Sequence, residues 1–205
     1  MKWTLTTLLA AALVFAVSGP GRAAPVTGLD VTSPTDTIVR VDGTNDGDTD
    51  SGLPPQNEGV ENAIDNDDAT KYLNFLDLGS GFEVTLDNYG AATLGGIALT
   101  TANDSPERDP ASVTITGSNN GVDWFPIITD LATPLSDDRF TEAEFYFTPE
   151  TAGTYGTYRV VFPTLKDADG ANSMQIADVR LLPEPATLAL VGLGAAATVL
   201  RRRKQ

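Results

Sequence analysis

The amino-acid sequence predicts an all-β, jelly-roll-like antiparallel β-sandwich that lies between two terminal segments, each with an apolar run. Between residues 24 and 182, short runs rich in Val, Ile, Thr, Phe and Tyr alternate with clusters of Gly, Pro, Asn and Asp, which is the pattern of short strands joined by turns. No long amphipathic helical period interrupts this pattern. The segment is long enough for one domain with a core and too short for two ordinary domains.

The N-terminal segment predicts a secretory signal peptide. Lys2 precedes an apolar stretch at residues 5–17, and the small residues Ala23 and Ala24 follow, as in signal peptides with a cleavage site. Cleavage after Ala23 also avoids a proline directly after the cut. We therefore expect a signal peptide at 1–23 and a mature domain at 24–182.

Nine strands are expected in the domain. The runs 82–86 and 113–116 alternate between apolar and polar residues, as strands do when one sheet face packs on a core, and Asn120-Gly121 is a hairpin-turn signal. Tyr72 and Trp124 are expected in the core, with stacking on a sugar as the alternative for Trp124. The expected strands are 27–32, 37–41, 82–86, 96–101, 112–118, 124–128, 139–147, 155–162 and 174–182.

An acidic loop is expected at residues 42–55. Asp46, Asp48 and Asp50 have the spacing of an EF-hand calcium loop, but Ser51 stands where the turning glycine belongs and Asn57 where the bidentate glutamate belongs. The sequence favours a solvated loop over a cation site at this position.

Four motifs further along the chain resemble the galactose-binding-like family of β-sandwiches, which is also called the discoidin or coagulation-factor C-type family. They occur in the order expected for that family, between about Glu58 and Leu182. The motifs are Asn-Ala-Ile-Asp-Asn-Asp-Asp-Ala-Thr-Lys-Tyr at 62–72, Val-Thr-Ile-Thr-Gly-Ser-Asn-Asn-Gly-Val-Asp-Trp at 113–124, Tyr-Arg-Val-Val-Phe at 158–162 and Ser-Met-Gln-Ile-Ala-Asp-Val-Arg-Leu at 173–181.

The resemblance implies a structural calcium ion. In that family an acidic loop and a residue pair on the last strand hold Ca²⁺ together, and oxygen ligands of mixed type suit this ion. Asn66 departs from the family's glycine, and Asp178 is one methylene shorter than the usual glutamate. The alternative is an Asx-rich turn without metal. The implied ligands are the side chains of Asp65, Thr70 and Asp178 and the backbone oxygens of Asn62, Asp67, Thr70 and Ala177.

Candidate ligand contacts lie in two polar loops. The loop 103–110 contains Asn103 and Arg108, and the loop 167–173 contains Asn172. Because loops can converge at one end of a sandwich without disturbing strand pairing, these residues are our candidates for binding. For Arg108 the sequence favours a loop-fixing ion pair with its acidic neighbours over hydrogen bonds to sugar hydroxyls. Sugar-binding relatives often use a histidine, and the chain has none.

The C-terminal segment 183–205 has three parts. Pro183-Glu184-Pro185 precedes an apolar run at 186–200 and a basic cluster at 201–204. As a helix the run would span about 22 Å, short of the ~30 Å hydrocarbon core, which favours a transient membrane segment with its basic end in the cytoplasm. The pattern resembles the PEP-CTERM sorting signal of Gram-negative bacteria. That resemblance implies an exosortase-type membrane protease as partner, transient attachment to the inner membrane, and a final place at the cell envelope, on the outer surface or outside the cell.

Composition narrows the function further. All 28 acidic residues except Glu184 lie in the domain, whereas six of the 13 basic residues lie outside it, so the domain's net charge is about −20. This charge argues against nucleic acid as a partner and favours cations or neutral ligands, although acidity is also common in exported proteins. The absence of Cys and His removes disulfides and imidazole or thiol catalysis.

Three function classes remain. The first is a non-catalytic binding module for a neutral glycan such as an extracellular polysaccharide of a biofilm matrix. The second is a structural matrix or envelope protein without a glycan ligand. The third, which the short chain disfavours, is a hydrolase that works through two carboxylates.

Overall fold

The computed structural model of the protein describes residues 30–43, 54–76 and 78–184. The expected signal peptide at 1–23, most of the acidic loop at 42–55, Pro185 and the apolar run at 186–200 lie outside these residues. Within them, the helices are all too short or too polar to cross a membrane.

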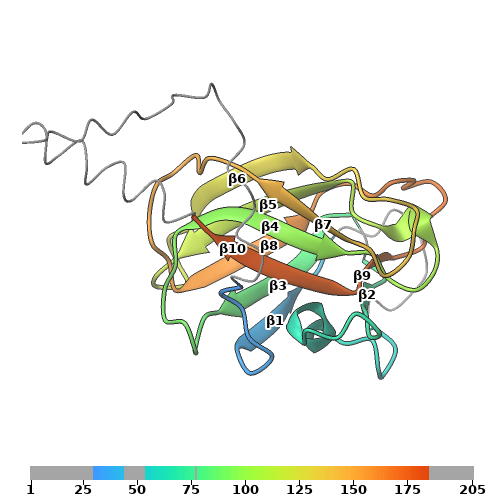
Figure 1. Ribbon diagram of the computed structural model, residues 1–205, viewed down its shortest axis with the longest axis horizontal. Helices are drawn as coiled ribbons and strands as arrows, with labels where there is room; N and C mark the ends of the chain where they lie inside the picture. The colour runs from blue at the N-terminus through green and yellow to red at the C-terminus, as the bar shows by residue number, and fades with distance from the viewer. Residues whose placement is uncertain (1–29, 44–53, 77, 185–205) are drawn as a thin grey trace, which may run out of the picture.

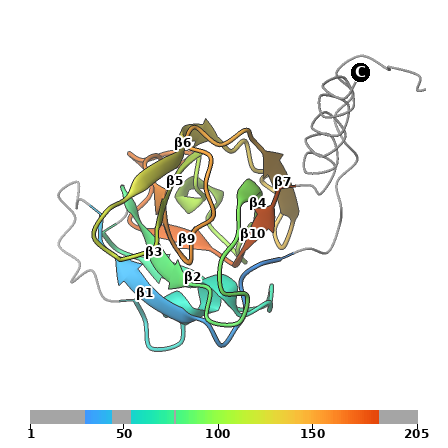
Figure 2. The same cartoon turned by 90° about the vertical axis from the view of Figure 1, so that its left-hand side faces the viewer.

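Two antiparallel sheets face each other across one core, and a two-stranded ribbon extends the sandwich at one end. The larger sheet has the order β1-β3-β8-β5-β6, the smaller has the order β10-β4-β7, and β2 pairs with β9. Figure 1 shows the smaller sheet lying across the larger one, and the view in Figure 2 separates the two layers. The elements are β1 (Thr37–Val41), the 3-10 helix η1 (Val60–Ile64), β2 (Tyr72–Asn74), β3 (Ser80–Thr85), β4 (Leu94–Thr100), the 3-10 helix η2 (Pro106–Arg108), β5 (Ser112–Ser118), β6 (Phe125–Ala132), β7 (Glu142–Tyr146), β8 (Thr157–Phe162), β9 (Met174–Ile176) and β10 (Asp178–Pro183).

The sequence pattern located most of these strands. β1 and β5 coincide with the expected ranges 37–41 and 112–118, and β3, β4, β6, β7 and β8 overlap theirs. The expected strand 174–182 is divided at Ala177, whose N–H donates to the carbonyl of Thr100 instead of continuing the β9 ladder. The expected strand 27–32 is wrong for residues 30–32, which form no ladder although Val31 N–H bonds the carbonyl of Leu181.

The core is built from apolar side chains that alternate along both sheets. Tyr72 is fully buried, as expected, and its hydroxyl donates to the carbonyl of Gly81 at 3.0 Å. Burying a large side chain of this kind contributes about 1.5–3 kcal/mol. The largest fully buried side chains include Tyr72, Tyr158, Phe82, Phe162, Ile64, Leu99 and Met174.

Trp124 does not belong to this core, so its expected role is wrong. Its ring is half-buried, and the guanidinium of Arg159 lies 4.3 Å from the ring centroid. The reason is topological: Trp124 directly precedes β6, which is an edge strand, and Arg159 projects from the outer face of β8, where it pairs with Glu83 at 2.6 Å. One face of the indole is therefore covered by a cation.

The loops gather at the two ends of the sandwich. One end, on the right in Figure 1, carries the loops 101–111, 133–141 and 163–173. We call it the network end, after the network of ion pairs and hydrogen bonds that joins these three loops. We call the opposite end, on the left in Figure 1, the tail end; it carries the turn 86–93, the hairpin 119–124 and the loop 147–156. Glu184 lies at this end too, because its N–H bonds the carbonyl of Thr93 in the turn.

Candidate functional site

The acidic loop after η1 is held by its own side chains. Asp65 accepts hydrogen bonds from the N–H of Asp67 at 2.9 Å and from the hydroxyl of Thr70 at 2.8 Å. Asn66 adopts a left-handed conformation with φ of 60°, which asparagine tolerates better than most residues. The loop is thus a compact turn that is closed by hydrogen bonds to Asp65.

Asp178, at the start of β10, meets this loop. Its Oδ1 atom accepts a hydrogen bond from the N–H of Asn66 at 3.3 Å, although the two residues are 112 positions apart. Burial raises the pKa of Asp178 to about 7, and the nearby negative charges of Asp30, Asp68 and Asp65 add to this effect. The buried carboxyl group therefore stands among like charges, an arrangement that a cation would relieve.

Two of the residues implied as backbone metal ligands, Asn62 and Asp67, hold the acidic loop by hydrogen bonds. The carbonyl of Asp67 accepts from both the N–H and the hydroxyl of Thr70, at 3.1 and 3.0 Å. The side-chain amide of Asn62 bonds the carbonyls of Asn57 and Lys71 at 2.9 and 2.8 Å and so closes the loop. Among residues 30–43, 54–76 and 78–184, no three acidic side chains form a metal-binding group by themselves, so an ion here would depend on carbonyl oxygens. The oxygen-only donor set fits a hard cation such as Ca²⁺.

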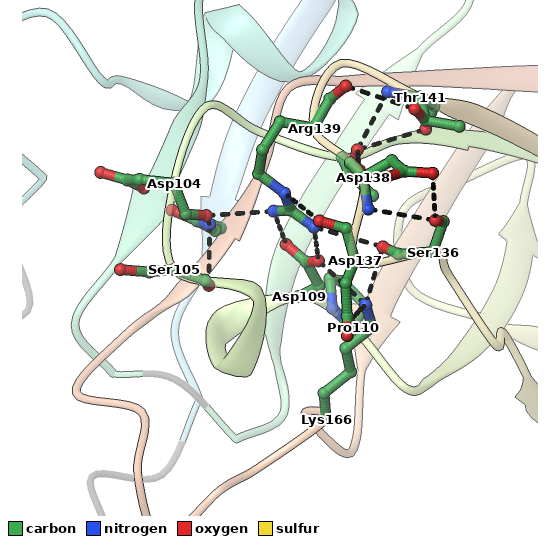
Figure 3. A network of polar contacts seen from close by, with 12 residues as sticks. Asp104, Ser105, Asp109, Pro110, Ser136, Asp137, Asp138, Arg139, Thr141 and Lys166 are labelled. Carbon is green, nitrogen blue, oxygen red and sulfur yellow. Dashed lines mark hydrogen bonds and ion pairs between the residues drawn. The ribbon is translucent and has the colours of Figure 1, made fainter.

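A buried ion network joins the three loops of the network end. Asp109 is fully buried, and Arg139 binds it through two hydrogen bonds, Nη1 to Oδ1 at 3.1 Å and Nη2 to Oδ2 at 2.6 Å (Figure 3). The ammonium of Lys166 lies 3.3 Å from the same carboxylate. Because one residue comes from each loop, this network fixes the loops relative to one another.

Further bonds connect this network to the acidic loop. Arg139 donates to the carbonyl of Asp104 at 3.0 Å, and Lys71 donates to the carboxylate of Asp104 at 2.9 Å. Gln175, on β9, accepts from Lys71 at 3.3 Å and donates to the carbonyls of Asp104 and Ser105. The candidate calcium loop and the network end are therefore parts of one cross-linked region.

Arg108 does not form the ion pair that the sequence favoured for it. Within the part of the chain that the structure describes, its guanidinium has no hydrogen bond or ion pair, and its Nε atom is buried without a partner. Arg139 and Lys166 occupy the acid beside it, Asp109, because they approach from the neighbouring loops. The side chain of Arg108 is half-buried and keeps its donors uncommitted.

The other two predicted contact residues are exposed. Asn103 lines a half-open hollow of about 240 Å³ together with Asn57, Glu58, Ala69, Thr70 and Lys71. Asn172 is exposed and accepts a hydrogen bond from the hydroxyl of Ser173 at 3.2 Å. The loops 101–111 and 163–173 run side by side, because the N–H of Asp167 bonds the carbonyl of Glu107 at 3.1 Å. The two loops therefore do face the same end.

The structure adds residues that sequence reasoning missed. Phe140 is 52% exposed at the network end, and its φ of 55° is unusual for a bulky residue. The partners Asp109, Arg139 and Lys166 were also missed. Phe140 lies in the range 139–147, which was expected to be a strand, and no local sequence pattern indicated that its side chain would be exposed. The basic residues that fix the loops are distant in sequence from the acid that they bind.

The sorting motif begins inside the fold. Pro183 is the last residue of β10 and stands opposite Leu94, and the N–H of Glu184 donates to the carbonyl of Thr93 at 2.8 Å. Gly95 leaves room for this contact, since a Cβ atom there would lie 3.0 Å from the Cα of Glu184. Pro185 lies outside the described residues.

Comparisons with known proteins agree with the two resemblances. The PEP-CTERM protein-sorting motif matches residues 182–204 and marks an exported protein that is sorted to the cell envelope and processed by an exosortase. No curated protein matches the sequence.

Solved structures of carbohydrate-binding modules have the same fold. The family 32 module of NanJ from Clostridium perfringens, solved in complex with galactose, is 14% identical, with a TM-score of 0.50 over 71% of this chain and 92% of that one. A pectin-binding module is 18% identical, with a TM-score of 0.50 over 73% and 91%. The module CBM32-3 from a family 31 glycoside hydrolase of C. perfringens is 15% identical, with a TM-score of 0.52 over 65% and 87%. The galactose-binding-like sandwich is thereby confirmed as the fold.

Proposed function

We propose that the protein is an exported, non-catalytic module of the cell envelope or extracellular matrix that binds a neutral glycan at its network end. A calcium ion stabilises the acidic loop, and an exosortase-type membrane protease processes the C-terminal segment. The C-terminal run at 186–200 holds the chain in the inner membrane until that step.

The observation that carries the glycan proposal is the rigid convergence of three loops around the buried carboxylate of Asp109. Loops that are fixed before binding lose little conformational entropy when a ligand arrives. They present exposed amides at Asn103 and Asn172, free guanidinium donors at Arg108 and an exposed ring at Phe140. An aromatic face with a few polar groups suits a sugar.

Charge and fold both support a neutral ligand. A domain charge of about −20 repels polyanions, and the fold is that of modules whose solved complexes include galactose. The buried acid at the centre of the network end is not free for catalysis, since Asp109 is bound by two cations. These features support a binding role over a hydrolase.

The calcium proposal rests on the unbalanced carboxylates of the acidic loop. Asp65, Thr70 and Asp178 would bind the ion through their side chains, and Asn62, Asp67, Thr70 and Ala177 would bind it through backbone oxygens. Burial, together with the nearby charges of Asp30, Asp68 and Asp65, raises the pKa of Asp178 and so disfavours its ionised form. When bound, the ion would supply a compensating positive charge and join the loop to β10.

The experiment is a glycan array probed with the domain, followed by affinity measurements on the best ligand. Arg108→Ala, Asn172→Ala and Phe140→Ala should each weaken binding, and losing a good hydrogen bond or a stacking contact costs about 1 kcal/mol, or about five-fold in Kd. Phe125→Ala, an exposed ring at the tail end, is the matched control and should bind normally. A folded domain that binds no glycan would favour the alternative, a purely structural matrix or envelope protein, for which the cross-linked loops serve stability alone.

A further inference from the structure

Large exposed apolar side chains gather at the tail end. Val122 is 78% exposed, Tyr89 54% and Phe125 45%. Among the described residues, five large hydrophobic side chains are exposed, and these three belong to the tail end. Three of the five therefore lie at one end of an acidic domain, whereas the other two, Val39 and Phe140, lie elsewhere.

The three side chains come from loops that contact one another. Gly156 packs against the carbonyl of Gly90, which follows Tyr89, and the N–H of Gly156 bonds Asn119 of the hairpin at 2.9 Å. The ring of Phe125 stacks on Tyr155, with centroids 5.8 Å apart. The patch therefore has a rigid base.

The chain leaves the fold beside this patch. The N–H of Glu184 bonds Thr93, and the hydroxyl of Thr93 lies 2.9 Å from that of Thr154, which in turn accepts a hydrogen bond from Asn119 through its carbonyl. Figure 2 looks onto this end of the sandwich. Glu184, Tyr89 and the 119–124 hairpin thus share one end.

The sequence leaves almost no spacer between the fold and the apolar run. After Glu184 only Pro185 precedes Ala186, and two extended residues reach at most about 7 Å. While the run at 186–200 lies in a bilayer, the tail end must therefore rest against the membrane surface. Tyr is enriched at that interface, and apolar side chains such as Phe are buried at its boundary with the acyl chains.

We propose that Tyr89, Val122 and Phe125 form a membrane-contacting surface that seats the folded domain on the lipid interface while its C-terminal segment is inserted. This inference rests on the membrane attachment in the proposed function. Three exposed carboxylates lie at the same end, those of Asp87, Asp123 and Glu150. Because anionic headgroups would repel them, the surface should bind zwitterionic lipid in preference to anionic lipid. The network end then points away from the membrane, where a glycan can reach it.

Trp124 provides a built-in probe. It is the only tryptophan of the chain 24–205, and it lies in the hairpin beside Phe125. The mature chain is mixed with phosphatidylcholine vesicles that contain lipids brominated near the headgroup, which quench tryptophan emission on contact. Flotation of the vesicles reports membrane attachment separately.

A flexible Gly-Ser linker inserted after Pro185 removes the geometric constraint. We expect the mature chain and the chain with the linker both to float with the vesicles. Trp124 emission should be quenched in both chains, because the surface binds lipid itself. In the linker chain, Tyr89→Ser with Val122→Ser should abolish quenching and leave flotation intact, whereas Phe140→Ser, at the opposite end, should change neither. Anionic lipid should reduce the quenching of the linker chain.

Four results would overturn the proposal. Flotation without quenching, or quenching that disappears when the linker is added, would refute a lipid-binding surface and leave the membrane segment intact. Absence of flotation would refute the membrane attachment as well. Loss of glycan binding in the Tyr89→Ser, Val122→Ser variant, with quenching unchanged, would assign these side chains to a sugar instead.

Discussion

Replacing Arg139 by methionine tests whether the buried network holds the site together. The change keeps an unbranched apolar stem but removes both hydrogen bonds to Asp109, whose side chain is 0% exposed. It also removes the bonds to the carbonyls of Asp104 and Ser136, at 3.0 and 3.2 Å. Lys166, at 3.3 Å, remains as the only cation beside the carboxylate in the described region.

The expected loss can be estimated from this geometry. Removing one partner of a buried ion pair costs about 3–5 kcal/mol, and the remaining Lys166 places Arg139→Met near the lower end, at about 3 kcal/mol. In a domain of this size each kcal/mol lowers Tm by about 2–4 °C, so Tm should fall by about 6–12 °C. Because Arg139 would no longer hold the three loops together in this variant, the glycan affinity should fall too.

Thermal unfolding by calorimetry or circular dichroism measures the change. Arg180→Met is the matched control, since Arg180 pairs with Glu142, whose side chain is 40% exposed, and such a pair contributes about 1 kcal/mol or less. Equal losses in the two variants, or a loss below about 1 kcal/mol for Arg139→Met, would refute the view that Asp109 organises the network end.

Three further predictions concern pH, calcium and packing. In the folded state the pKa of Asp178 is raised from 3.8 to about 7, so the folded state binds this proton more tightly than the unfolded state does. Without metal, the free energy of unfolding should therefore fall as pH rises from about 4 to 7, by at most about 1.4 kcal/mol per pH unit. Asp178→Asn should flatten this profile, which urea titrations at several pH values measure. Calcium should raise Tm more at pH 7.5 than at pH 5, and chelation or Asp65→Ala should remove the increase; identical melting curves with and without calcium would exclude the ion. Gly81→Ala should prevent folding, because its Cβ would lie 2.0 Å from the carbonyl oxygen of Val160, and a soluble variant with native circular dichroism would contradict the register of β3 and β8.

Local patterns in the sequence were sufficient for most of the fold. Alternation of apolar and polar residues located β3 and β5, since the side-chain period of a strand is a local property. β2 was missed because three buried residues, Tyr72 to Asn74, give no period. The single expected strand at 174–182 became two, because Ala177 bonds β4 rather than the partner of β9.

The candidate site was predictable only in part. The acidic loop and Asp178 were both selected from sequence, and the structure brings them within hydrogen-bonding distance. An ion pair was expected for Arg108 because it has acidic neighbours in the sequence, but its guanidinium has no partner among the described residues. The acid next to it is bound instead by Arg139, 30 positions away, and only the folded chain brings these two together.

By itself, the sequence determined the C-terminal sorting motif, the acidic domain charge, the absence of Cys and His, and the β-sandwich, because composition and short-range patterns carry these properties. The tertiary structure alone decided which cations bind Asp109, that Trp124 lies beneath Arg159 outside the core, and that the sorting motif begins at the end of the sandwich where Tyr89 and Val122 are exposed. These features depend on contacts between segments far apart in the chain, and such contacts are set by the packing of the two sheets rather than by any local pattern.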